Sequence, residues 1–369
     1  MRYPLACPDI TQHEIDAVVD VLKTPHLALG PKLPEFEQKF AAYCGTRYAV
    51  AVSSGTTALH LIVRGLGIGP GDEVITTPFS FVASTNAILY ERGRPVFVDI
   101  DRDTWNIDES RIASAITSRT KAVLAVDVFG MPADYDRIRK DAARGGLRVI
   151  EDSCEALGSR CGGRMAGGLA DVGVFGFYPN KQLTTGEGGM IVTDDDELAR
   201  LCKSMRNQGR DTDGGWLAHP RMGYNYRLSD INCALGIAQL DRIEQLLAVR
   251  RRVAGWYREE LGDDRRVRFQ KIRDGVDMSW FVLVVCLADE YSMDDRDRIL
   301  KRLRDRGIGC SNYFAAIHLQ PYMMDAFGLK RGDFPVCEAV ADRTVALPFQ
   351  KNLSRDDVAT ICHEFRQLL

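Results

Sequence analysis

The stretch of this chain best suited to chemistry is F-G-F-Y-P-N-K-Q-L-T-T-G-E-G-G-M, residues 175–190, which contains one lysine, Lys181. A lysine amine is protonated near neutral pH and becomes a nucleophile only where its surroundings lower its pKa. Lys181 follows an apolar, aromatic run and precedes Gly186, Gly188 and Gly189. These glycines permit a left-handed turn and a close approach of the backbone to a bound molecule, although G-E-G-G alone is more typical of a hairpin turn.

A phosphate site is indicated upstream, where a predicted buried strand over 49–53 is followed by a helix that begins with S-G-T-T at residues 54–57. Such a junction gathers free backbone N–H groups and the positive end of the helix dipole at one point. The same residue types form ordinary helix N-caps very often. The turn is therefore weak evidence when taken alone.

An acid ends another predicted strand, since residues 148–151 lead directly into Asp152. Strands alternate with helices in this part of the chain, which predicts a mostly parallel sheet whose ligands collect at the carboxyl ends of the strands. Asp152 lies at such an end. The alternative for a single aspartate in E-D-S-C-E-A-L-G is a helix N-cap.

The residues around the lysine complete a recognisable pattern. Pro179 and Asn180 precede Lys181, and Thr184 and Thr185 follow it. This loop resembles the Schiff-base lysine loop of pyridoxal phosphate (PLP) enzymes. Over nearly its whole length, the chain resembles the DegT/StrS family of PLP-dependent sugar aminotransferases, which have the aspartate aminotransferase fold (fold type I).

The resemblance implies cofactor and substrate roles for a set of residues spread along the chain. Lys181 would hold the aldehyde of PLP and, once released, act as the acid and base of the reaction. Asp152 would keep the ring nitrogen protonated, and Phe81 would stack on the ring. The implied cofactor-binding residues are Gly55, Thr56, Thr57, Phe81, Asp152, Glu155, Lys181 and Asn225, and the implied substrate-binding residues are Tyr313 and His318.

Two positions depart from the pattern of many family members. Glu155 stands where many have glutamine, and a carboxylate beside the phenolic oxygen of PLP would alter the hydrogen bonding of that oxygen. Gly176 stands where many have a small hydroxyl residue that binds phosphate, so this contact must be missing or replaced. Asn225 matches an asparagine that binds the PLP phosphate of the neighbouring subunit, which implies a homodimer with shared active sites.

Composition narrows the class of protein further. The 369 residues are 45% hydrophobic and 27% charged, which is ordinary for globular proteins. A net charge of -3 and a pI near 6.1 do not indicate the basic surface that binds nucleic acid. Without a signal-peptide pattern or a membrane-spanning apolar run, we expect a soluble, cytoplasmic protein that does not bind membranes. Ten cysteines without a C-x-x-C pair indicate reduced, mostly buried thiols rather than a metal or redox site.

The expected fold is α/β, with a three-layer large domain built on a mostly seven-stranded mixed sheet and a smaller C-terminal α+β domain. We place the large PLP-binding domain at 1–245, with its N-terminal helix near the small domain, and the small domain at 246–369. Apolar spacing predicts one amphipathic helix from 229 to about 261 and a strand over 280–287. Residues 210–230 lack apolar periodicity and are predicted to be a surface loop.

The resemblance implies transamination of a nucleotide-linked keto sugar with glutamate as amino donor, for polysaccharide or glycoside biosynthesis. The pattern P-N-K-x-L-T-T-G-E-G-G is closer to carbon-4 than to carbon-3 enzymes, which favours a 4-keto-6-deoxyhexose. An aminotransferase that forms a cyclitol, from an inosose, or an aminohydroxybenzoate is the alternative enzyme. A non-catalytic regulatory or scaffolding homologue would be expected to lack Lys181 or Asp152. An NAD enzyme is disfavoured because no G-x-G-x-x-G follows a predicted strand.

Overall fold

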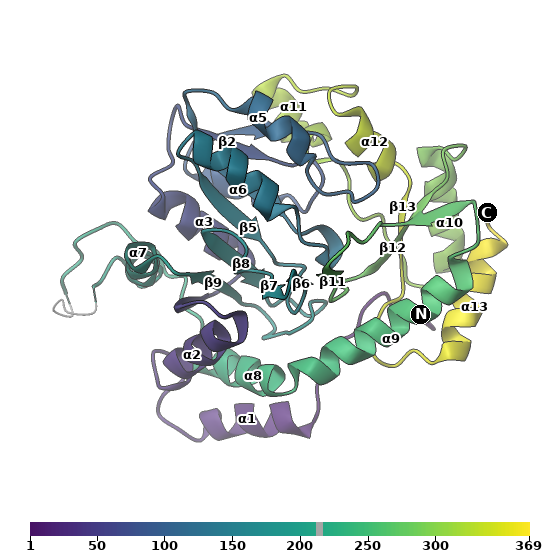
Figure 1. Ribbon diagram of the computed structural model, residues 1–369. Helices are drawn as coiled ribbons and strands as arrows, with labels where there is room; N and C mark the ends of the chain where they lie inside the picture. The colour runs from purple at the N-terminus through teal and green to yellow at the C-terminus, as the bar shows by residue number, and fades with distance from the viewer. Residues whose placement is uncertain (212–216) are drawn as a thin grey trace.

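The structure is a computed structural model that describes residues 1–211 and 217–369. Its centre is a seven-stranded mixed sheet in which five neighbouring strands run parallel and the strand after the lysine loop runs antiparallel (Figure 1). The predicted α/β sheet is thus confirmed. In spatial order the strands are β1 (Tyr48–Val52), β9 (Gly189–Thr193), β8 (Val172–Gly176), β5 (Arg148–Asp152), β4 (Thr120–Val126), β2 (Glu73–Thr76) and β3 (Arg94–Phe97).

Helices cover both faces of this sheet and make three layers. Side chains alternate between the two faces of a strand. Accordingly, Leu124 and Val126 of β4 belong to one core, and Val123 and Ala125 belong to another. The first core is closed by α3 (Gly55–Gly65), α4 (Ala83–Tyr90) and α7 (Asp196–Arg206), and the opposite face is covered by α6 (Tyr135–Arg144), α2 (Lys32–Cys44) and α8 (Asp230–Asp241).

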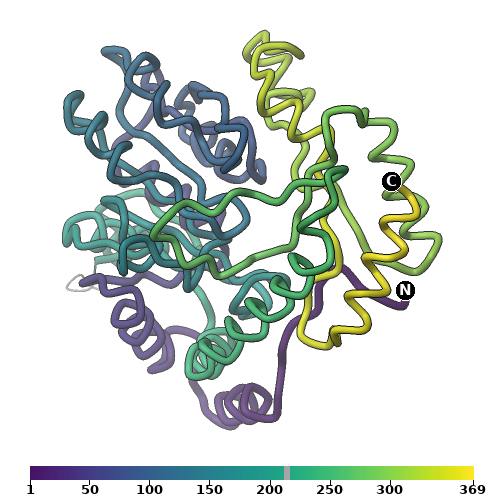
Figure 2. Tube along the Cα trace, turned by 45° about the vertical axis from the view of Figure 1, so that its right-hand side comes forward, coloured from purple at the N-terminus to yellow at the C-terminus, as the bar shows by residue number. Residues whose placement is uncertain are grey.

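A second, smaller unit is built on a three-stranded antiparallel sheet beside the large one (Figure 1). Tyr3, near the N-terminus, is buried in its core and forms a bridge with Ile308, so both chain ends lie on this side of the molecule (Figure 2). The helix α1 (Gln12–Leu22) packs on α8 instead. The smaller unit contains β10 (Val267–Phe269), β12 (Leu283–Leu287), β13 (Thr344–Leu347), α10 (Met293–Asp305), α13 (Arg355–Arg366) and part of α9 (Ile243–Leu261).

Two predicted elements differ from the structure. The single helix expected from 229 to 261 is two helices, α8 and α9, separated at Arg242, whose side chain pairs with Asp9 and Glu14 of the N-terminal segment. The strand expected from residue 280 begins only at Leu283, because Trp280 has a positive φ of 59°. Phe281 then donates its N–H to Phe129 of the large unit rather than to the small sheet.

The chain beyond residue 246 returns to the large unit at several places. The arm that precedes β12, green in Figure 2, carries β11 (Val276–Asp277), which pairs with β6 (Arg160–Cys161) next to β7 (Arg164–Met165). Later, the N–H groups of Val336 and Cys337 at the start of α12 (Pro335–Ala341) bond to Asp99. The domain boundary at 245 stays a prediction, since the two units share these contacts.

The remaining elements are short and connect the layers. They are η1 (Glu109–Arg111), α5 (Ile112–Ala115), η2 (Val128–Gly130), η3 (Ile317–Leu319) and α11 (Pro321–Phe327).

Residues 212–216 of the predicted surface loop lie outside the described residues. Among the helices that are described, none has the length and apolarity needed to span a membrane. All ten cysteines are free and most are buried, as expected.

Candidate active site

A cavity of about 660 Å³ opens at the carboxyl ends of the parallel strands. It lies there because β4, β5 and β8 run in the same direction and end side by side, at Val126, Asp152 and Gly176. Lys181 enters it from the loop after β8, and residues 312–315 close it from the side of the smaller unit. The structure thus brings the predicted lysine, the predicted acid and the predicted phosphate turn to one place.

The start of α3 forms one end of the cavity through Ser54, Gly55 and Thr56. The N–H groups of Gly55 and Thr56 have no carbonyl within the helix to bond, because these are its first residues. Thr57 does not line the cavity, since its N–H donates to the Ser54 hydroxyl at 3.1 Å and its own hydroxyl donates to the Ser54 carbonyl at 2.8 Å. Gly55 and Thr56 are therefore the residues with amides open to an anion.

Glycine is required where this turn meets β9. A Cβ on Gly189 would lie 2.5 Å from the carbonyl carbon and oxygen of Ser54 and 2.7 Å from the Gly55 nitrogen. Its partner across the strand pair, Gly176, has more room, because its nearest neighbour would be Cys154 Sγ at 3.5 Å. A methyl group at position 176 would therefore make only ordinary van der Waals contacts.

Asp152 presents a buried carboxylate at the end of β5. Its Oδ2 accepts a hydrogen bond from the Ser84 hydroxyl at 2.7 Å, and its Oδ1 accepts one from the Cys154 N–H at 3.2 Å. The side chain is thereby fixed at the wall of the cavity. A carboxylate held in this way can pair with a cationic ring nitrogen, which is the role implied for it.

The loop after β8 holds Lys181 by backbone and hydroxyl contacts. The Lys181 N–H donates to the Tyr178 carbonyl at 2.9 Å, and the Thr184 hydroxyl and the Thr185 N–H both donate to Phe177 at 3.0 Å. Gly186 then turns the chain with a φ of 81°. The two threonines and the glycine of the sequence pattern therefore close the loop rather than face the cavity.

The Lys181 amine lies between the Phe281 ring and the Glu155 carboxyl group. Its Nζ is 3.8 Å from the centroid of Phe281 and 3.8 Å from Glu155 Oε1. Glu155 Oε2 accepts a hydrogen bond from the Phe129 N–H at 2.8 Å. Burial raises the pKa of the Glu155 carboxyl to about 7, against the opposing attraction of the nearby Lys181 amine. Glu155 is thus an acid that changes charge near neutral pH beside the reactive amine.

Aromatic residues form the mouth of the cavity. Phe81 lines it and is 60% exposed. Tyr313 lines the opposite side, with its ring stacked on Phe314 at 4.9 Å between centroids and near-parallel to Phe281 at 6.3 Å. Burial and the nearby Glu155 carboxylate raise the pKa of Tyr313, which keeps it a neutral hydrogen-bonding phenol.

Besides Thr57, two more predicted site residues lie outside the cavity of the chain. The His318 side chain is fully buried, and its Nε2 bonds to Glu338 Oε1 at 2.9 Å, so it braces the segment before α12 instead of meeting a substrate. Asn225 is exposed and forms a backbone bridge with Asn207. A role for Asn225 at a site therefore requires the cavity of another subunit.

Several lining residues were not predicted from the sequence. Ser84 could have been suspected, because it follows β2 in a run of small polar residues. Phe281 and Phe314 carry no local signal, since they come from the chain beyond residue 246 and meet the lysine only after the chain has folded. Arg250, which does not line the cavity but bonds to the lysine loop from behind, was not predicted either, because it lies in an ordinary helical pattern.

Comparison with known proteins decides the family. The model of the DegT/DnrJ/EryC1/StrS aminotransferase family matches residues 8–366. The chain belongs to this aminotransferase family. It is 37% identical to GDP-perosamine synthase of Caulobacter vibrioides, over 100% of this chain and 98% of that protein. It is 36% identical to spore coat polysaccharide biosynthesis protein SpsC of Bacillus subtilis, over 99% and 97%.

A solved structure shares the fold and shows the cofactor of the family. The PLP-form of Spr1654 from Streptococcus pneumoniae has a TM-score of 0.95 and 29% identity, over 100% of this chain and 98% of that chain. The cofactor of this aminotransferase is PLP. The cavity fits it, because open amides at Gly55 and Thr56, the fixed carboxylate of Asp152 and the Lys181 amine surround one space.

Proposed function

We propose that this aminotransferase transfers the amino group of glutamate to the keto carbon of a nucleotide-linked 4-keto-6-deoxyhexose. The transfer itself follows from the family, and the meeting of Lys181, Asp152 and the start of α3 in one cavity is the observation that carries the proposal. The names of two relatives, a GDP-perosamine synthase and a spore coat polysaccharide biosynthesis protein, support a sugar as the acceptor. The pattern around Lys181 supports carbon 4.

Each polar residue of the cavity has a part in this reaction. PLP, when bound, supplies a ring that withdraws electrons from the carbon next to the transferred amine. Lys181 Nζ removes a proton from that carbon of glutamate and later delivers a proton to the sugar carbon that receives the amine. Asp152 supplies the negative charge that keeps the ring nitrogen protonated, and the amides of Gly55 and Thr56 bind the phosphate.

We further propose that the active unit is a homodimer. Asn225 is exposed, and its backbone forms a bridge with Asn207, the residue that follows α7. An exposed amide that does not reach its own cavity supports the role implied by the resemblance, which is to bind the phosphate in the cavity of the partner. His318 has no part in the proposed site, because its ring is buried against Glu338.

A substrate screen tests the proposed acceptor and donor together. The PLP-loaded protein is incubated with glutamate and with UDP-, GDP- or dTDP-linked 4-keto sugars, and the products are analysed by mass. We expect amination of at least one of these sugars, and Lys181→Arg, which keeps the charge but cannot replace the amine, is the inactive control. Turnover of an inosose or an aminohydroxybenzoate precursor, with no nucleotide sugar aminated, would show the alternative enzyme.

A further inference from the structure

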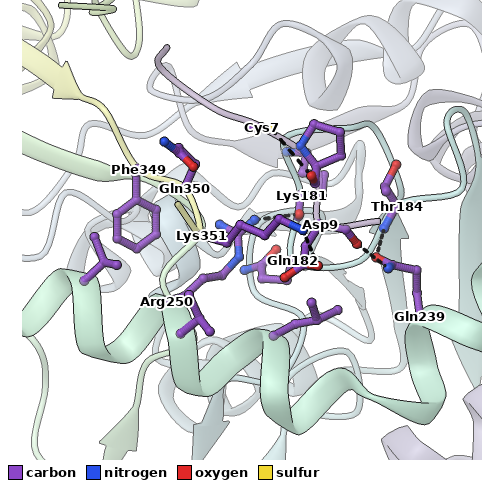
Figure 3. Close-up of a pocket in the computed structure, with 14 residues that line it drawn as sticks. Cys7, Asp9, Lys181, Gln182, Thr184, Gln239, Arg250, Phe349, Gln350 and Lys351 are labelled. Atoms are coloured by element: carbon purple, nitrogen blue, oxygen red, sulfur yellow. Dashed lines mark hydrogen bonds and ion pairs between the residues drawn. The ribbon is translucent and has the colours of Figure 1, made fainter. Parts of the chain in front are cut away.

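Behind the lysine loop, Arg250 of α9 connects the two units of the molecule. Its side chain points from the helix towards the loop in Figure 3, next to the Phe349 ring. The guanidinium donates to the carbonyl of Lys181 at 2.7 Å and to the carbonyl of Phe281 at 3.0 Å. Longer contacts of 3.4 Å reach the carbonyls of Asn180 and Trp280. One side chain thus joins the backbone of the lysine loop to the backbone that precedes β12.

These two stretches of backbone carry the groups that meet in the active-site cavity. The Lys181 amine lies 3.8 Å from the centroid of the Phe281 ring, although Phe281 comes from the distant part of the chain beyond residue 246. The aliphatic stem of a lysine has four rotatable bonds and the backbone of a loop can move. The place of the amine over the ring therefore depends on a link between the two backbones, and Arg250 is bonded to both.

Using an arginine for this link costs free energy, because its charge is partly removed from water. Arg250 is half-buried, and burial lowers the pKa of its guanidinium to about 10. Among the described residues, no carboxylate lies within ion-pair distance of it, so carbonyl oxygens and the Phe349 ring surround the charge. The flat guanidinium presents donors in a fixed fork that can reach two chains at once, which a lysine ammonium cannot reproduce.

We propose that Arg250 is a positioning residue of the aminotransferase reaction. It holds the Lys181 loop and the Phe281 segment at a fixed separation, and so keeps the Lys181 amine where it must transfer its proton. The proposal rests on the PLP chemistry of the family and is independent of which sugar is the acceptor.

The test compares Arg250→Lys with the wild type, both loaded with PLP. Arg252→Lys is the matched control, because Arg252 is an exposed arginine of the same helix. We expect kcat for the half-reaction with the amino donor to fall roughly 10–100-fold in Arg250→Lys, the range for a small misplacement of a reacting group. KM for the donor should stay within about threefold of the wild type, because Arg250 does not reach the cavity.

A second readout needs no substrate at all. PLP is added to the PLP-free protein, samples are reduced with borohydride at intervals, and the label on the Lys181 peptide is measured by mass. We expect this label to form roughly tenfold more slowly in Arg250→Lys than in Arg252→Lys. A failure of the proposed sugar or donor leaves this readout unchanged, so the two ideas fail separately.

A third variant distinguishes a loss of positioning from a folding defect. Arg250→Ala should regain labelling and turnover when millimolar guanidinium is added, whereas methylammonium of equal charge should restore neither. Should Arg250→Lys keep kcat and the labelling rate of the wild type, the proposal is overturned. A lower melting temperature with unchanged kcat at full PLP occupancy would also overturn it, since Arg250 would then only stabilise the fold. The same holds if methylammonium rescues Arg250→Ala as well as guanidinium does.

Discussion

At the scale of single residues, Glu155 is a side chain of the cavity whose charge depends strongly on its surroundings. It is buried, it accepts one backbone hydrogen bond, and its neighbour at 3.8 Å is the Lys181 amine. Glutamine would keep the contact with Phe129 only by turning its amide oxygen towards the N–H. Glu155 therefore gives the site a group that titrates near neutral pH, which glutamine at this position would not do.

Glu155→Gln should change how stability depends on pH. A carboxyl whose pKa is about 7 when folded and near 4.5 when unfolded keeps its proton in the folded state across that window. The folded wild type then binds more protons than the unfolded chain, so its stability falls as pH rises from about 4.5 to 7. Glutamine removes this loss, and the variant should gain up to about 3 kcal/mol relative to the wild type across the window.

Urea unfolding of the PLP-free protein at several pH values measures this difference. Glu187→Gln is the control, because Glu187 lines the same cavity but is exposed. The control should follow the wild type at every pH. Parallel stability profiles for Glu155→Gln and the wild type would contradict the raised pKa of Glu155.

At the scale of elements, the contact between β9 and the start of α3 decides whether an anion can bind. The turn at residues 54–56 can expose its amides because β9 passes directly against it, with Gly189 at the crossing. β8 and β9 are paired so that Gly176 faces Gly189. These neighbouring glycines differ in the space around them, and this difference makes a matched pair of variants.

Gly189→Ala should weaken PLP binding at least tenfold. The new methyl group would lie 2.5 Å from the Ser54 carbonyl, so the turn must move and displace the amides of Gly55 and Thr56. Gly176→Ala should change the affinity by less than about threefold, because its methyl group meets only ordinary van der Waals contacts. Titration of the PLP-free variants with PLP, followed by visible absorbance, measures both. Equal losses in the two variants would count against the phosphate assignment.

At the scale of the whole molecule, the site is assembled from distant parts of one chain and, by our proposal, from a second chain. The lysine loop and the acid come from the large unit, whereas Phe281 and Tyr313 come from the chain beyond residue 246. The two units are held together by β11, by the start of α12 and by Arg250. The proposed dimer adds Asn225 of the partner.

Mixing two defective variants tests the shared site. A dimer of one Lys181→Ala and one Asn225→Ala subunit has one cavity with both lesions and one intact cavity. Random pairing of equal amounts should give half mixed dimers, and so about one quarter of the sites intact. Each variant is first assayed alone, and the mixture is assayed after subunit exchange. An activity equal to the mean of the two variants would show that Asn225 serves its own chain or no site.

The sequence by itself determined the family, the cofactor and the residues at the strand ends. It could do so because the lysine loop, the turn after β1 and the acid at the end of β5 are local patterns, and because parallel strands must bring their carboxyl ends together. Gly55, Thr56, Asp152 and Lys181 all line the cavity for this reason.

The tertiary structure alone decided what surrounds the amine and which predicted residues stay out of the cavity. Phe281 and Arg250 reach the lysine loop through contacts between residues 69 or more positions apart, and no local pattern encodes them. His318 and Thr57 looked suitable by type, but burial against Glu338 and capping by Ser54 use their polar groups. Whether a side chain is free to bind depends on its partners, and those are set only when the chain has folded.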